Sequence, residues 1–156
     1  MNPELVHELY SLLIPLGQER LIVPRACVAE VTTWQVPEEM AGAPSWYLGT
    51  IQWSGRAVPV ISFEMACGQP LPPAGTRTRI VIFNALGNQL PMGHFGIITQ
   101  GFPQLVRVNG DVVKADPSRG FEPGPVLCQV RMLNESPLIP DFEWLEKMIA
   151  EETRVA

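Results

Sequence analysis

The chain has 156 residues, 46% of them hydrophobic and 17% charged, which is typical of one ordered domain or of two tightly joined small lobes. Its net charge of −5 and its scattered basic residues argue against nucleic acid and against an anionic membrane surface as partners. The chain has neither an apolar run of roughly 18 residues nor the basic start of a secretory signal, so we expect no direct membrane insertion and a cytoplasmic location.

The N-terminal part of the chain predicts short strands joined by turns. Glu8–Leu16 and Arg20–Pro24 are rich in branched apolar residues and form a predicted hairpin around a glycine turn. Ala26–Thr33 fits either a strand or one helical turn. Proline, glycine and acidic residues make Gln35–Pro44 a predicted loop.

Two further strands, Thr50–Trp53 and Ala57–Ser62, flank a predicted Ser-Gly-Arg turn. Pro59 has no N–H to donate to a ladder, so we expect its strand to lie at a sheet edge or a bulge. Such an edge is a place where another protein can dock. Phe63–Gly68 fits a single helical turn that ends at its glycine.

The segment Gln69–Gly75 contains three prolines, which make it stiff and extended. It is therefore the predicted boundary between two lobes, at approximately 17–75 and 76–135, which the terminal segments complete. Asn109-Gly110-Asp111 is the strongest hairpin signal of the second half. The strands predicted after the proline segment are Arg79–Ala85, Phe95–Thr99, Leu105–Val108, Val112–Lys114 and Val126–Leu133.

Pro140 and Asp141 open a terminal helix that runs to about Glu152. Its apolar residues recur at helical spacing and predict a buried face of Phe142, Leu145 and Ile149. Its acids predict the solvated face, which contains Glu143, Glu146, Glu151 and Glu152. With 16 prolines and 13 glycines, the chain as a whole favours an all-β fold with one C-terminal α-helix.

Residues that could carry chemistry are few. Cys67 and His94 are a conceivable nucleophile and base, but no helper motif or oxyanion loop accompanies them, so we favour a small buried thiol and a turn or strand histidine. Three widely spaced cysteines suit reduced thiols better than disulfides. The sequence has no Cys-x-x-Cys or His-x-x-x-His spacing and no phosphate-binding glycine loop. We therefore predict no catalytic residue, no metal site and no cofactor.

The aromatic residues of the first half allow two interpretations. Their large areas favour a core cluster, and the alternative is that one or two of them anchor an interface. Strand alternation places Ile51 inward, Gln52 outward and Trp53 inward again. The residues concerned are Trp34, Trp46, Tyr47 and Trp53.

Three features follow one another in a specific order: Val28-Ala29-Glu30-Val31, a loop that ends at Ala43-Pro44, and Gly49 followed by Gly55 and Pro59-Val60-Ile61. This order resembles the CheW-like adaptor family of bacterial chemosensory systems. The resemblance runs from about Ser11 to Leu145. The closing Ile139-Pro140-Asp141 with its helix is similar to the adaptor variants of type IV pilus (twitching motility) systems.

The resemblance implies a single CheW-like domain over residues 1–156, built from two five-stranded SH3-like β-barrel lobes around a shared core. It also implies a non-enzymatic scaffold that couples methyl-accepting chemoreceptors to the regulatory domain of a CheA-type histidine kinase. The positions that match family contacts are Val28, Val31 and Gly49 for the kinase, and Ser54, Gly55 and Arg56 for the receptor.

Two departures from the family pattern concern receptor coupling. Ser54 stands where the family usually has the arginine associated with receptor binding. Arg56 lies two residues later, and on a strand it would share the face of Ser54 and partly substitute for the missing arginine. The segment Ile97-Ile98-Thr99-Gln100-Gly101 lacks the acid that the family usually has.

Two other classes of function stay open at this point. One is a small β-barrel enzyme that uses Cys67 and His94, which requires their side chains to meet in a pocket. The other is a ligand-sensing barrel that holds a small molecule between its lobes.

Overall fold

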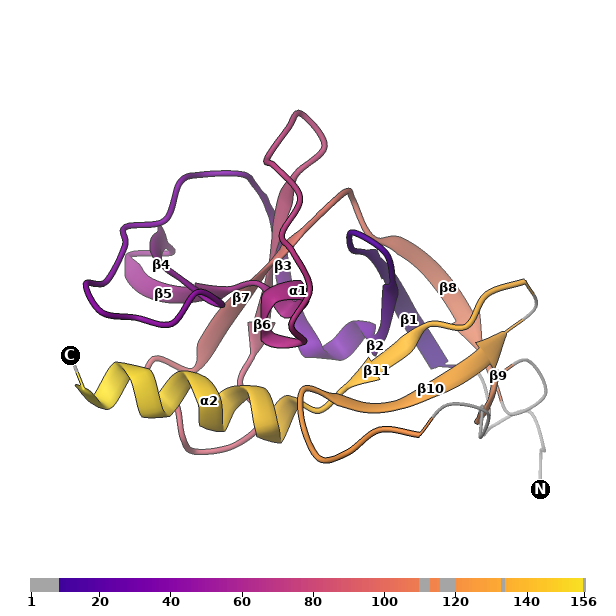
Figure 1. Ribbon diagram of the computed structural model, residues 1–156. Helices are drawn as coiled ribbons and strands as arrows, with labels where there is room; N and C mark the ends of the chain where they lie inside the picture. Colours follow the sequence, from indigo (N-terminus) through magenta and orange to yellow (C-terminus); the bar gives the residue numbers. More distant parts are fainter. Residues whose placement is uncertain (1–8, 110–112, 116–119, 133, 156) are drawn as a thin grey trace, which may run out of the picture.

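A computed structural model describes residues 9–109, 113–115, 120–132 and 134–155 as two β-sheets and a long C-terminal helix (Figure 1). The six-stranded sheet has the order β8-β1-β2-β11-β10-β9, and the five-stranded sheet has the order β3-β6-β7-β5-β4. The strands of the first sheet are β1 (Leu9–Pro15), β2 (Arg20–Pro24), β8 (Gln104–Val108), β9 (Val113–Ala115), β10 (Val126–Met132) and β11 (Leu138–Pro140). Those of the second are β3 (Val28–Thr33), β4 (Tyr47–Trp53), β5 (Arg56–Ile61), β6 (Arg79–Asn84) and β7 (His94–Thr99). The helical segments are η2 (Arg25–Cys27), α1 (Phe63–Ala66) and α2 (Phe142–Val155).

The predicted fold class is confirmed: the protein is all-β, with two SH3-like lobes and a C-terminal helix. One sheet has a sixth strand because the short β9 pairs with β10. In the other lobe, Glu38 forms an isolated antiparallel bridge with Thr50 of β4. This bridge ties the segment that follows β3 to β4, so it brings the two edge strands of the sheet toward closure.

The lobes do not divide at the proline segment. Gln69–Gly75 connects α1 to β6, and β6 and β7 complete the sheet that β3, β4 and β5 begin. The strands β1 and β2 instead pair with β8 and β11 from the C-terminal half. The chain thus starts one lobe, builds the whole of the other, and then returns to the first. Composition marks stiff connections, but it carries no information on which distant strands pair.

Pro59 lies in an internal strand, not at an edge. β5 is between β4 and β7, and Pro59 is buried opposite Thr50. The N–H and C=O groups of Thr50 both form hydrogen bonds with Glu38, so Thr50 and Pro59 are a non-hydrogen-bonded pair. At this pair the backbone polar groups of Pro59 point away from β4. The pairing of β5 with β7 begins only at Val60. The missing N–H therefore falls where no ladder bond is required of it.

Two other predictions need correction or completion. The hairpin expected at Asn109-Gly110-Asp111 lies partly outside the described residues, and the flanking strands pair elsewhere, β8 with β1 and β9 with β10. The strand β11 was not predicted. It has three residues, too few for a periodic pattern, and it forms because Leu138 pairs in parallel with Leu21 of β2.

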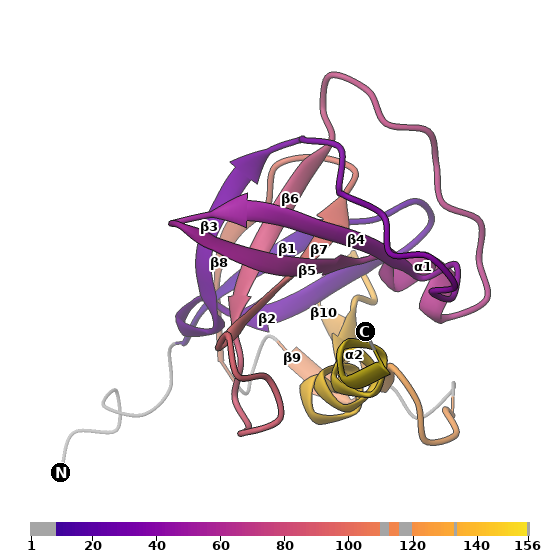
Figure 2. The ribbon, with the colours of Figure 1, turned by 90° about the vertical axis from the view of Figure 1, so that its left-hand side faces the viewer.

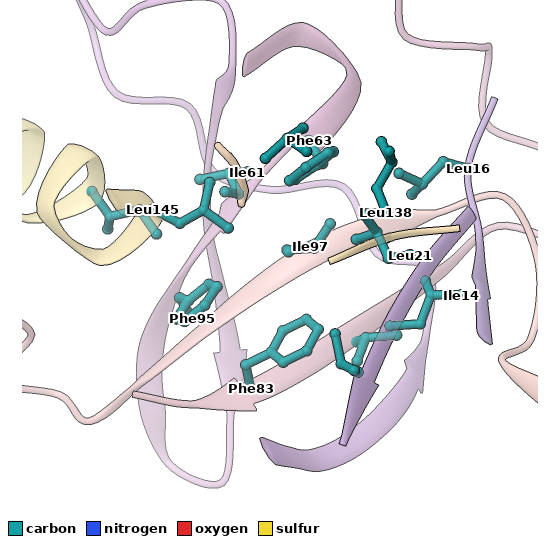
Figure 3. Packing of buried hydrophobic residues seen from close by; sticks show 14 of the residues in the cluster. Ile14, Leu16, Leu21, Ile61, Phe63, Phe83, Phe95, Ile97, Leu138 and Leu145 are labelled. Carbon is teal, nitrogen blue, oxygen red and sulfur yellow. The ribbon is translucent and has the colours of Figure 1, made fainter. Parts of the chain in front are cut away.

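Among the described residues, the buried side chains form three clusters. One lies inside the six-stranded sheet around Leu13 and Met132, and another inside the five-stranded sheet around Ile51 and Ile80. The largest lies between the lobes and is shared by both (Figure 3). Its members include Ile14, Leu21, Ile61, Phe63, Phe83, Phe95, Ile97, Leu138 and Leu145. Burial of this much apolar surface joins the two lobes into one unit.

The helix α2 extends from the six-stranded sheet along the five-stranded one (Figures 1 and 2). The Asp141 carboxylate accepts a hydrogen bond of 3.0 Å from the Trp144 N–H and so caps the first turn. Leu145 and Ile149 are fully buried, as predicted, and Phe142 packs half-buried against Phe83. α2 therefore closes the shared core from outside the sheets.

Glu146 corrects the prediction of a solvated acidic face, because only 1% of its surface is exposed. Its carboxylate oxygens accept hydrogen bonds from the backbone N–H groups of Leu86, at 2.8 Å, and Gly87, at 2.9 Å. Both donors lie in the turn between β6 and β7. Glu146 thus anchors that turn to α2 with two charge-assisted hydrogen bonds.

Candidate functional site

The strand β3 forms one edge of the five-stranded sheet and carries two of the predicted contact residues. Val28 and Val31 are half-buried and both pack against the shared core, although their spacing of three would put them on opposite faces of a regular strand. A bulge between Val28 and Glu30 shifts the register of β3 against β6. The bulge turns the two valines to the same side. The edge strand therefore presents a pair of partly exposed apolar side chains beside an exposed Glu30.

Gly49, predicted as a kinase contact, is buried in β4, where two backbone segments lie in contact. It has a φ of +133°, in the region that L residues avoid, and it sits at a bulge opposite Val60. A Cβ atom at this position would overlap the backbone carbonyl of Glu38, coming within 2.6 Å of its carbon. Only a glycine allows the chain after β3 to lie directly against β4.

The turn between β4 and β5 consists of two residues, Ser54 and Gly55. Their φ angles are +51° and +76°, the signs of a type I′ turn, and Trp53 pairs with Arg56 across it. Both turn residues are exposed and form the tip of the hairpin. Ser54 therefore does not lie on a strand, and the expectation that Arg56 would share its face by strand alternation is wrong.

Replacing Ser54 with asparagine should raise the free energy of unfolding by about 0.5 kcal/mol, because asparagine accepts the left-handed conformation of a type I′ turn more readily than serine. Urea denaturation of both proteins measures the difference. Ser45→Asn, at another exposed turn serine, whose φ is not positive, is the matched control and should leave stability nearly unchanged. A loss of stability in Ser54→Asn would contradict the assigned turn type.

Arg56 is exposed, and its guanidinium is tethered. One of its terminal nitrogens donates a hydrogen bond of 3.2 Å to the Met92 carbonyl oxygen. The same oxygen lies 3.3 Å from Nδ1 of His94, whose ring packs at 4.8 Å between centroids against Trp53. The tip of the β4–β5 hairpin and the turn that precedes β7 thus form one surface, with a positive charge held at a defined place on it.

The residues missed by sequence reasoning act on this surface through the backbone. Met92 contributes a carbonyl oxygen, which no side-chain pattern reveals. The Glu146 carboxylate holds the same turn from the other side. Glu146 lies four residues after Phe142 and three before Ile149, a helical spacing that places it on the same face as these two buried residues. A polar residue on a predicted buried stripe usually has a specific partner.

The aromatic residues follow the core interpretation. Tyr47 is buried and, as predicted, Ile51 points inward while Gln52 is exposed. Trp46 packs half-buried against the shared core, and Trp34 and Trp53 do the same against the cluster inside the five-stranded sheet. Burial, with a smaller effect of the Glu152 carboxylate, raises the pKa of the Tyr47 phenol.

Cys67 and His94 have different surroundings. Cys67 is exposed at the end of α1 and lines a groove between the lobes, whereas His94 packs on Trp53 and is not among the residues that line that groove. The pair that the enzyme alternative requires is therefore not assembled.

The remaining candidates for chemistry also lack a suitable setting. Burial raises the pKa of the Cys27 thiol, which favours its unreactive protonated form. Within the described residues, no three His, Cys, Asp or Glu side chains gather in a way that could hold a metal ion.

Over the part of the chain that the structure describes, no helix is long and apolar enough to cross a membrane.

Comparison with known proteins identifies the family. The CheW-like domain family matches residues 11–139, which is most of the chain. Among solved structures, the scaffolding protein TtCheW from Thermoanaerobacter tengcongensis is similar over 90% of this chain and 89% of its own, with a TM-score of 0.74 and 16% identity, a likeness that shows the fold. A search of curated proteins found no match. The order of strands, the two lobes around a shared core and the family match agree, and the chain belongs to the CheW-like domain family.

Proposed function

We propose that this protein is a non-enzymatic, cytoplasmic adaptor that couples methyl-accepting chemoreceptors to the regulatory domain of a CheA-type histidine kinase. Membership of the CheW-like family supports an adaptor role. The pathway is a chemosensory two-component pathway, either for chemotaxis or for twitching by type IV pili. The similarity of the segment Ile139-Pro140-Asp141 and its helix to pilus-system adaptors favours the second.

The observation that carries the kinase part of the proposal is the edge strand β3. Its outer edge offers backbone groups to a second β-protein, and Val28 and Val31 add partly exposed apolar side chains on one side. In this proposal the regulatory domain of the kinase is also CheW-like and built of β-strands. One of its lobes can therefore pair edge to edge with the lobe that contains β3. Such a contact is small, and its strength would come from repetition in an array.

In this proposal Gly49 supports the kinase-binding surface but does not itself contact the kinase. It is buried, and it keeps the chain around Glu38 packed on β4. A substitution at Gly49 would reach a partner through displacement of this segment. Stability must therefore be measured beside binding for any Gly49 variant.

The receptor part of the proposal rests on the hairpin tip. Ser54 and Gly55 are exposed, and Arg56 beside them carries a positive charge held by the Met92 carbonyl. An acidic or carbonyl-rich helical tip of a receptor can accept hydrogen bonds from this guanidinium. Arg56 thus takes the role that an arginine at position 54 has in relatives, from a neighbouring place.

Val28→Glu should weaken binding of a CheA-type regulatory domain by about tenfold or more, because a carboxylate buried at an apolar contact lacks a partner. Isothermal titration calorimetry with the purified regulatory domain measures the change. Val36→Glu introduces the same charge at an exposed valine in the loop after β3 and should bind like the wild type. Equal affinities of Val28→Glu and wild type would remove β3 from the kinase interface.

A further inference from the structure

A groove of about 640 Å³ lies between the lobes, away from the residues proposed above to bind the kinase and the receptor. None of Val28, Val31, Ser54 or Arg56 lines it. Its floor is made of side chains from the shared core, and its walls are two proline-containing segments, 69–73 and 121–125. The apolar side chains that line it include Leu16, Phe63, Leu71, Phe121, Val126 and Leu138.

The first wall of this groove, segment 69–73, lies against the turn that follows β1. Each wall contains prolines, whose rings fix the backbone φ angle. Gly17 lies so close to the first wall that an added Cβ would be 3.0 Å from Cγ of Pro72. The buried Glu64 carboxylate accepts hydrogen bonds from the Gly17 N–H, at 3.1 Å, and from the Gln100 side-chain amide, at 3.3 Å. The volume of the groove, about 640 Å³, is large enough to take several side chains of a ligand.

The groove has a one-sided charge. The ionisable side chains on its lining are the acids Glu19, Glu64 and Glu122, together with the Cys67 thiol, and among the described residues no Lys, Arg or His lines it. Glu122 is exposed and Glu19 half-buried. An apolar floor below acidic groups is complementary to a ligand that has an apolar face and positive charges beside it.

We propose that this groove binds an amphipathic peptide segment of a partner protein, with large apolar side chains on Leu16 and Phe63 and a Lys or Arg near Glu122. Small molecules are usually fixed by several directed polar groups. Here the most buried polar side chain on the lining, Glu64, is already committed to Gly17 and Gln100. Recognition by shape and charge suits a peptide in a groove. This site is a third one, and its existence does not depend on the kinase or the receptor.

The test uses a fluorescein-labelled peptide of leucine and lysine patterned as an amphipathic helix, and a second peptide in which glutamate replaces lysine. Titration into the ¹⁵N-labelled protein should shift the amide signals of Gly17, Cys67 and Gly124, and only the lysine peptide should do so. Glu122→Lys should weaken its binding by about threefold to tenfold. Glu151→Lys changes the net charge equally on α2 and should bind like the wild type.

Each alternative outcome overturns the proposal. Equal weakening by both charge reversals would reduce the effect to net charge. Equal binding of the glutamate peptide would contradict the acidic complement. Shifts of the same amides with dodecyltrimethylammonium but not with the peptide would make the ligand a small amphiphile, and shifts that depend on protein concentration alone would make it a second copy.

Cys67→Trp, which fills the groove from an exposed position, should abolish peptide binding while leaving the remaining amide spectrum unchanged.

Discussion

Gly49→Ala should lower the free energy of unfolding by about 3 kcal/mol or more. Two costs add at this position. The backbone φ of +133° is strained for any L residue, and the new methyl group would collide with the Glu38 backbone. The Glu38–Thr50 bridge, with its hydrogen bonds of 2.8 and 3.0 Å, would have to open. Urea denaturation followed by circular dichroism measures the loss, and hydrogen exchange at Thr50 reports the bridge.

Gly55→Ala is the matched control for this prediction. Gly55 also has a positive φ, +76°, but a Cβ added there would meet no atom of the described residues within 4 Å. Its substitution should cost only the conformational strain, about 1 kcal/mol. If the two variants lost the same stability, close packing of the loop on β4 would play no part in the role of Gly49.

Glu146→Gln should destabilise the fold by about 2 kcal/mol. Glutamine keeps the shape of the side chain but has one acceptor oxygen, and its amide N–H₂ would face one of the two backbone N–H donors of Leu86 and Gly87. The turn that carries Met92 would loosen, and with it the tether of Arg56. Thermal and urea unfolding measure the stability, and the NMR signal of the Arg56 side chain reports the tether.

Glu143→Gln removes the same charge from an exposed position of α2 and should change stability by less than about 0.5 kcal/mol. An equal effect of the two substitutions would mean that Glu146 acts through the net charge of the helix. A stability loss in Glu146→Gln with an unchanged Arg56 signal would separate the anchor from the hairpin surface.

Local sequence patterns predicted the elements whose cause is local. The hairpin of β1 and β2 and the one of β4 and β5 follow from apolar runs joined by glycine-containing turns. The lobe division could not be predicted, because pairing of β2 with β11 joins residues from opposite ends of the chain. For Pro59, the residue type restricted hydrogen bonding, but the strand that remained unpaired at that point depends on where β7 begins.

The candidate surface was predictable in part. The resemblance suggested Val28, Val31 and the hairpin tip as contact residues, and they stay a prediction. The bulge that turns both valines to one side could not be predicted, because it depends on pairing with β6. The strand-alternation argument for Arg56 was wrong, because Ser54 lies in a turn and the Arg56 guanidinium is held by the Met92 carbonyl oxygen. Glu146 shows the limit of charge as a signal: helical spacing placed it on the buried stripe, and its charge suggested solvent.

We propose that one molecule of this protein joins a kinase to a receptor. The direct measurement is sedimentation of purified CheA-type regulatory domain with vesicle-anchored receptor tips, with and without this protein. We expect the regulatory domain to sediment only when the protein is present. Val28→Glu should leave the protein on the receptor but release the kinase domain, and Arg56→Glu should release both, whereas the exposed Arg77→Glu should not. Retention of the regulatory domain without this protein, or binding of kinase and receptor only in turn and never together, would contradict it.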